Sequence, residues 1–112
     1  MITLKTLPQA TAQEVYDQVK AHLLQQNARS EHNGSCLYRG PGGLKCAAGC
    51  LIGDDEYFPE MESSWDDLVY DKSVPDAHEE LINRLQEIHD SRDVKNWGKC
   101  LSELALEFEL NS

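Results

Sequence analysis

Four side chains near the middle of the chain are of the types that bind zinc: His32, Cys36, Cys46 and Cys50. One nitrogen and three sulfurs suit the tetrahedral coordination of this ion. Only Cys46 and Cys50 have the short spacing common in structural zinc sites, and unligated cysteine is among the most buried residue types. The sequence therefore favours buried free thiols with no cofactor, and a small zinc-stabilised module is the alternative.

Cys46 is also a candidate nucleophile. It follows Lys45 and lies near Arg39 in the sequence, and positive potential from these side chains favours the thiolate form of a cysteine. A cysteine nucleophile also needs a base within hydrogen-bond reach. None of the four histidines has a sequence position that places it beside Cys46, so a cysteine-dependent enzyme is the second alternative.

An acidic segment follows the cysteines. Between residues 54 and 71 there are eight acids and no Lys or Arg, and aromatic and aliphatic residues alternate with the acids, which indicates a folded segment and not a disordered acidic tail. The spacing lacks the glycine of a calcium-binding loop. Carboxylates on a rigid scaffold can also imitate the phosphates of a nucleic acid. We therefore expect a partner-binding surface made of Asp54, Asp55, Glu56, Glu60, Glu62, Asp66, Asp67 and Asp71.

Composition narrows the kinds of partner. The chain has 112 residues with a formal net charge of −10, which disfavours direct contact with nucleic acid or an anionic membrane and favours a basic protein surface. No apolar run approaches the ~18 residues of a membrane helix, and no leader pattern begins the chain. We expect one domain over residues 1–112, in the cytoplasm, where cysteines stay reduced.

The patterns of the first half predict a helix, a hairpin and a short buried helix. The capping box of Thr11 and Glu14 starts a helix over about 11–27, in which His22 has a structural role. Residues 37–39 and 44–46 flank a Gly-Pro-Gly-Gly turn and are expected to pair as a small β-hairpin. The small residues of 46–52 favour a short buried helix, whereas residues 28–35 are expected to form a loop.

In the second half, we expect irregular structure with one short helix over 54–71, followed by a helical hairpin. One apolar stripe follows a helix start at 73–76, a second runs from Val94 to Phe108, and residues 89–93 join them. Trp65 and Trp97 are expected in the core. The predicted fold is mainly α, of the α+β type, with an N-terminal helix, a small β-hairpin with a short small-residue helix, and a C-terminal antiparallel helical hairpin.

Three sequence motifs also point to a family. They are Cys36-Leu-Tyr-Arg-Gly40, Gly43-Leu-Lys-Cys-Ala-Ala-Gly-Cys-Leu-Ile52, and Leu85-Gln-Glu-Ile-His-Asp90 with the later Trp97. In these motifs the chain resembles a family of small uncharacterised proteins of tailed bacteriophages and prophages, which has no assigned activity. The resemblance implies expression in a bacterial host cytoplasm. With the acidic composition, it favours a non-enzymatic accessory protein that binds and modulates a host protein, as an inhibitor or a nucleic-acid mimic.

Overall fold

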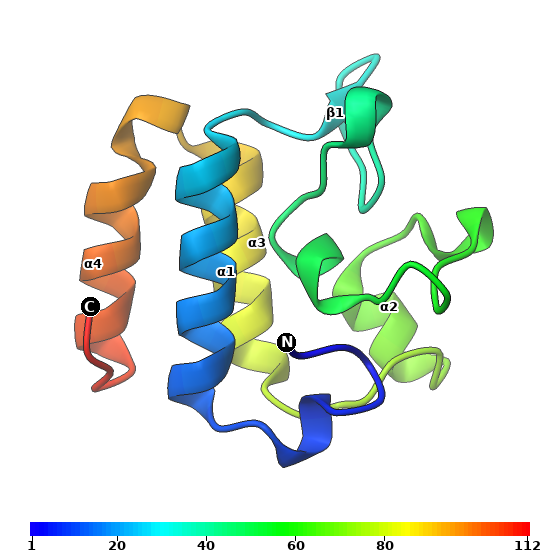
Figure 1. The fold of residues 1–112 in the computed structure, drawn as a ribbon, viewed down its shortest axis with the longest axis horizontal. Coiled ribbons are helices and arrows are strands. Elements are labelled where there is room, and N and C mark those ends of the chain that lie inside the picture. The colour runs from blue at the N-terminus through cyan, green and yellow to red at the C-terminus, as the bar shows by residue number, and fades with distance from the viewer.

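Three helices form one half of the molecule and pack against one another (Figure 1). They are α1 (Ala12–Gln26), α3 (Glu79–Ser91) and α4 (Trp97–Glu107). The computed structural model describes all residues from 1 to 112. The other half is made mainly by residues 27–78, which lie beside α1 and α3. None of the helices has the length and apolar character needed to cross a membrane.

The second half contains short elements only. Its regular structure is a two-stranded antiparallel sheet and one short helix, so the chain is mainly α with a small hairpin, as predicted. These elements are β1 (Glu31–His32), β2 (Ser35–Cys36) and α2 (Trp65–Tyr70). Single turns of 3₁₀ helix occur along the chain at Leu7–Gln9, Pro41–Gly43, Ala48–Leu51, Pro59–Met61 and Val94–Asn96.

Helix α1 begins and ends as its sequence predicts. The Thr11 hydroxyl accepts the Glu14 N–H at 3.1 Å, and the Glu14 carboxylate accepts the Thr11 N–H at 2.8 Å. The helix ends at Asn27, which takes the left-handed conformation with φ 50°. His22 has the expected structural role, because its ring bonds the Lys45 carbonyl at 2.9 Å.

The β-hairpin lies earlier in the chain than predicted. Asn33 and Gly34 both have positive φ and form a tight turn, so that Glu31 pairs with Cys36 within a stretch expected to be a loop. The predicted strands 37–39 and 44–46 do not form. The reason is that the Tyr38 and Arg39 amides, which a strand would use, are bound by the Glu62 carboxylate.

The small-residue segment packs as the short buried helix that was predicted, in 3₁₀ form. Ala48, Gly49 and Leu51 are buried, and a Cβ atom at Gly49 would lie against the Tyr38 backbone carbonyl. The Arg39 guanidinium binds the carbonyls of Gly49 at 2.8 Å and Ile52 at 2.6 Å. Side chains and close contacts within residues 36–52 therefore fix the backbone of this same segment.

The C-terminal helical hairpin is present, with shifted boundaries. Helix α3 begins at Glu79, after His78 in the left-handed conformation, and not near residues 73–76. It continues to Ser91, so His89 and Asp90 belong to the helix and not to the connection. Both tryptophans lie in the core as expected, with Trp65 2 % and Trp97 0 % exposed.

Candidate functional site

The predicted zinc ligands are not gathered at one point. No three of His32, Cys36, Cys46 and Cys50 bring ligand atoms within 4.8 Å of one another. His32 is exposed on β1, whereas Cys46 is buried at the entrance to the Ala48–Leu51 turn.

A different set of potential ligands meets where β2 faces α3. Cys36, His89 and Asp90 each place one ligand atom within 4.8 Å of the others. His89 Nδ1 lies 2.7 Å from Asp90 Oδ1, and Gln86 Nε2 donates to the same oxygen at 2.7 Å. The Cys36 sulfur lies within 4.8 Å of a ligand atom of each of the other two residues. Asp90 is thus the common acceptor of His89 and Gln86, with the Cys36 thiol beside it.

The proton arrangement of this cluster suits hydrogen bonding better than metal binding. The Ser30 backbone N–H can only donate, so His89 Nε2 accepts from it at 3.0 Å. In a neutral imidazole the proton then lies on Nδ1, which donates to Asp90 and has no free lone pair for an ion. The arrangement is complete without a metal, and it also leaves no nitrogen of His89 to act as a base for Cys36.

Burial keeps the thiols protonated. It raises the pKa of Cys36 to about 12, and the nearby Asp90 carboxylate adds to the shift. Burial likewise raises the pKa of Cys50 to about 12, against the lowering effect of Lys45 and Arg39. For Cys46, which is 1 % exposed, burial raises the thiol pKa strongly, contrary to the expected lowering by its cationic neighbours. The activated thiolate expected of a cysteine nucleophile is therefore not favoured at Cys46.

Four of the eight predicted binding acids form hydrogen bonds or ion pairs within the protein. Glu56 accepts the N–H groups of Leu4, Lys5 and Gly53, and Glu62 accepts those of Tyr38 and Arg39. Burial would raise the Glu56 pKa, but these hydrogen bonds outweigh it and lower the value.

The other two of these four acids, Asp54 and Asp71, lie at the surface. Asp54 pairs with Arg39 at 3.1 Å and Lys45 at 3.5 Å, and Asp71 accepts the Ser73 N–H at 3.0 Å. Asp71 nonetheless remains exposed at the end of α2.

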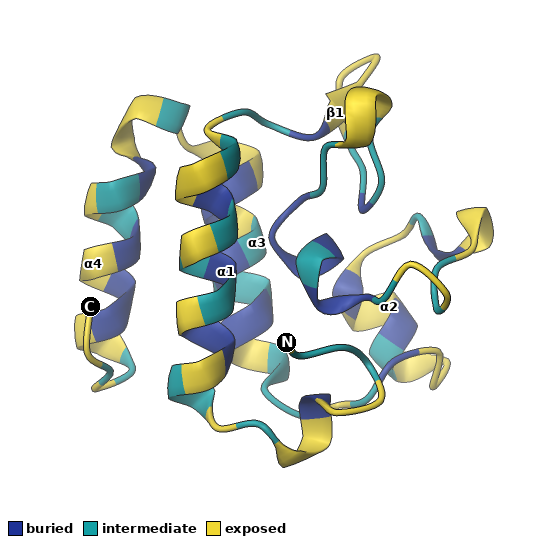
Figure 2. Ribbon diagram, viewed as in Figure 1, coloured by how far each residue is buried: buried dark blue, intermediate teal, exposed yellow.

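Three carboxylates and one aromatic ring share the outward side of α2, which we call the α2 face: Asp66, Asp67, Tyr70 and Asp71. Trp65 and Leu68 point into the core on the opposite side, and the Ser64 hydroxyl caps the helix start. Tyr70 is 90 % exposed, and Figure 2 shows exposed residues along this short helix. The α2 face is thus an acidic surface with an uncovered aromatic ring.

One contact on the α2 face brings two acids together. Asp66 is in hydrogen-bond contact with Glu79 at the start of α3, and this contact raises the pKa of Glu79. Asp66 also accepts from the Asn83 amide at 2.6 Å. Lys72 is the only Lys or Arg between Asp54 and Asn83, so the chain supplies little positive charge to offset these acids.

A cleft lies next to the α2 face, between residues 34–38, residues 62–65 and one side of α3, with Cys46 in its wall. We call it the α3 cleft; its volume is about 830 Å³. The residues from α3 are Asn83, Gln86, Glu87, Asp90 and Ser91. Sequence reasoning missed these residues. Their spacing of three and four is a detectable signal of one helix side, but an ordinary solvated side has the same pattern.

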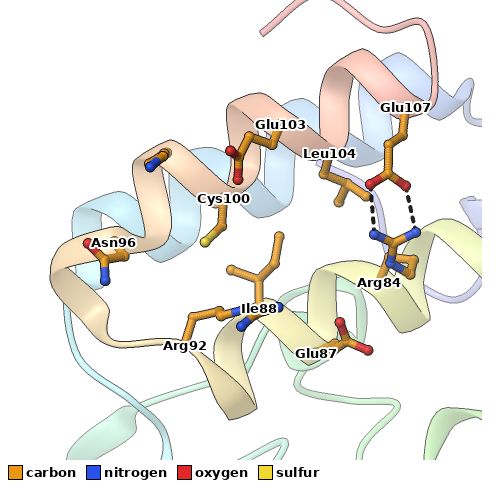
Figure 3. Close-up of a pocket in the computed structure, with 10 residues that line it drawn as sticks. Arg84, Glu87, Ile88, Arg92, Asn96, Cys100, Glu103, Leu104 and Glu107 are labelled. Atoms are coloured by element: carbon orange, nitrogen blue, oxygen red, sulfur yellow. Dashed lines mark hydrogen bonds and ion pairs between the residues drawn. The ribbon is translucent and has the colours of Figure 1, made fainter.

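A second hollow of about 430 Å³ lies between α3 and α4. Arg84 and Glu107 form a two-bonded ion pair across it at 2.7 and 3.0 Å, and Cys100 and Ile88 lie between the two helices (Figure 3). Acidic and basic residues both line this groove, and Arg84 and Glu107 already neutralise each other across it. It shows no preference for one kind of ligand.

Comparison with protein-family models, with curated proteins and with solved structures finds no match for this chain. The α2 face and the α3 cleft are the two surfaces whose geometry bears on function.

Proposed function

We propose that this protein is a non-enzymatic binding protein that holds a basic surface of another protein against its α2 face. The observation that carries the proposal is Tyr70, 90 % exposed on a six-residue helix whose other outward residues are acidic. Tyrosine is enriched at protein interfaces, because its ring gives a large contact area at a low entropic cost. Acidic residues around it add long-range attraction for a basic partner.

The Asp66 and Glu79 contact supports the same proposal. The hydrogen-bond contact with Asp66 raises the pKa of Glu79, and burial and repulsion between the two carboxylates add to the shift. A lysine or arginine of a partner placed between them would remove this repulsion and add a charge-assisted hydrogen bond. Asp66 and Glu79 therefore offer the cation of a partner two acceptors side by side.

The resemblance to bacteriophage and prophage proteins supplies the kind of partner. A bacterial host protein with a basic surface fits both that context and the net charge of −10. The protein would then act as an inhibitor or modulator of that host protein. If the basic surface normally holds a duplex, it would act as a nucleic-acid mimic.

The test is affinity capture from a bacterial lysate with the whole chain as bait, followed by mass spectrometry. We expect the wild type to retain a partner with a basic surface that salt releases, and the double variant Asp66→Lys, Asp67→Lys to lose it. The double variant Glu103→Lys, Glu109→Lys is the control, because it changes the net charge equally at exposed positions away from α2. Equal capture by both variants, or no partner for the wild type, would contradict the proposal.

A further inference from the structure

The charged residues that line the α3 cleft are all acidic. None of its lining residues is Lys, Arg or His, whereas Glu62, Glu87 and Asp90 are acidic. Glu62 and Asp90 are already bonded inside the protein, but Glu87 is exposed and takes part in none of the ion pairs. Glu87 also borders the groove between α3 and α4, where Arg84 and Arg92 lie, but it forms no ion pair with either. The cleft therefore has one carboxylate without an ion-pair partner and no cation in its own lining, which suits a ligand with positive charge.

Trp65 supplies an aromatic part of the cleft. Its ring packs edge-on against Tyr38 with 6.2 Å between centroids, and both residues line the cleft. The Trp65 indole N–H is the only buried side-chain polar group that has no hydrogen-bond partner. Native proteins rarely leave such a donor unpaired. An indole N–H can only donate, so the partner that it lacks is an acceptor such as a peptide carbonyl.

The cleft and the α2 face form one continuous surface. Ser64 lines the cleft and caps α2, and Asn83 lines the cleft while its amide bonds Asp66 on the α2 face. Along α3, the cleft extends from Asn83 to Ser91, which is about 12 Å at the rise of an α-helix. About four residues of an extended chain span this length.

We propose that the α3 cleft receives a short extended segment of the partner that carries a lysine or arginine, whose cation pairs with Glu87. This inference rests on the proposed function, because the same partner would cover the α2 face. It adds the form of the ligand: a basic extended segment in a cleft and not only a flat basic surface.

The first experiment is a ¹⁵N NMR titration with a capped pentapeptide of alternating lysine and serine, and with a glutamate-serine peptide as the control. We expect saturable shifts of the Trp65 indole signal and of amides at the cleft. The Trp97 indole signal is an internal control, because its N–H already donates to the Arg92 carbonyl at 3.2 Å. Shifts limited to the α2 face, or spread over all acidic surfaces, would overturn the inference and leave the proposed function standing.

The second experiment compares Glu87→Lys with Glu103→Lys. Both residues line the groove between α3 and α4, but only Glu87 lines the α3 cleft. We expect Glu87→Lys to weaken binding of the lysine-serine peptide about fivefold or more, near 1 kcal/mol, and Glu103→Lys to change it less than about twofold. Equal effects of the two variants would overturn the inference. Loss of partner capture by Asp66→Lys, Asp67→Lys alone would then assign binding to the α2 face.

Discussion

At the scale of single residues, Asp90 connects the sequence's cysteine-rich segment to its C-terminal helices. Its carboxylate accepts from His89 and Gln86 on its own helix, and the Cys36 thiol on β2 lies beside it. His89 is 0 % exposed, so its ring N–H depends on this acceptor. Removing the carboxylate would leave a buried donor unpaired, which costs more than the loss of an exposed hydrogen bond.

The variant Asp90→Ala should therefore lose about 1–3 kcal/mol of unfolding free energy at neutral pH. Burial would raise the Asp90 pKa, but the contacts with His89, Cys36 and Gln86 outweigh it and lower the pKa from its ordinary value. A lowered carboxyl pKa stabilises the fold above the unfolded-state value, and this contribution is lost as pH falls through the folded-state value.

Urea unfolding at about pH 7 and about pH 3 checks this linkage. The difference between wild type and Asp90→Ala should be smaller at the lower pH. Asp93→Ala is the control, because Asp93 is an exposed acid whose side chain makes no cap hydrogen bond. A difference that does not change with pH would show that the charge of Asp90 has no role.

At the scale of elements, the Ala48–Leu51 turn depends on close backbone contact and α4 does not. Gly49 lies directly against the Tyr38 carbonyl, so a methyl group there must displace backbone. Gly98 lies in α4, and a methyl group there would meet no atom within 4 Å. Replacing the two glycines by alanine should therefore change stability in opposite directions.

We expect Gly49→Ala to destabilise the fold by about 2 kcal/mol through overpacking. Gly98→Ala should stabilise it by about 0.5–1 kcal/mol, because alanine loses less backbone entropy in a helix. Thermal unfolding of both variants by circular dichroism measures the two signs. A neutral Gly49→Ala variant would mean that the contact with Tyr38 relaxes without cost.

At the scale of the whole molecule, the net charge of −10 opposes the compact state. Exposed ion pairs such as Arg84 with Glu107 contribute little in compensation. Salt screens both effects, but repulsion among many acids is the larger.

The melting temperature should therefore rise between about 10 mM and about 300 mM NaCl, as measured by calorimetry. The rise should be smaller for Asp66→Lys, Asp67→Lys, in which two negative charges become positive. A melting temperature that falls with salt would show that ion pairs outweigh the repulsion.

Features that depend on residues close together in the sequence were predicted correctly, and a feature that depends on distant residues was not. The capping box of α1 and the apolar stripes of α3 and α4 are local patterns, and the structure has these helices where the patterns lie. The hairpin was placed wrongly, because the amides of Tyr38 and Arg39 bind Glu62, more than twenty residues away. No local pattern contains that contact.

The candidate site shows the same division. The acidic character of residues 54–71, the helical segments and the burial of both tryptophans were predictable without coordinates, because they follow from composition and periodicity. Three features became visible in the fold alone: Glu56 and Glu62 bind backbone amides, Asp66 and Tyr70 face outward, and Cys36 lies beside His89 and Asp90. Packing joins residues that are distant in sequence, so acids that it buries accept hydrogen bonds from the protein, whereas exposed acids such as Asp66 stay accessible to a partner.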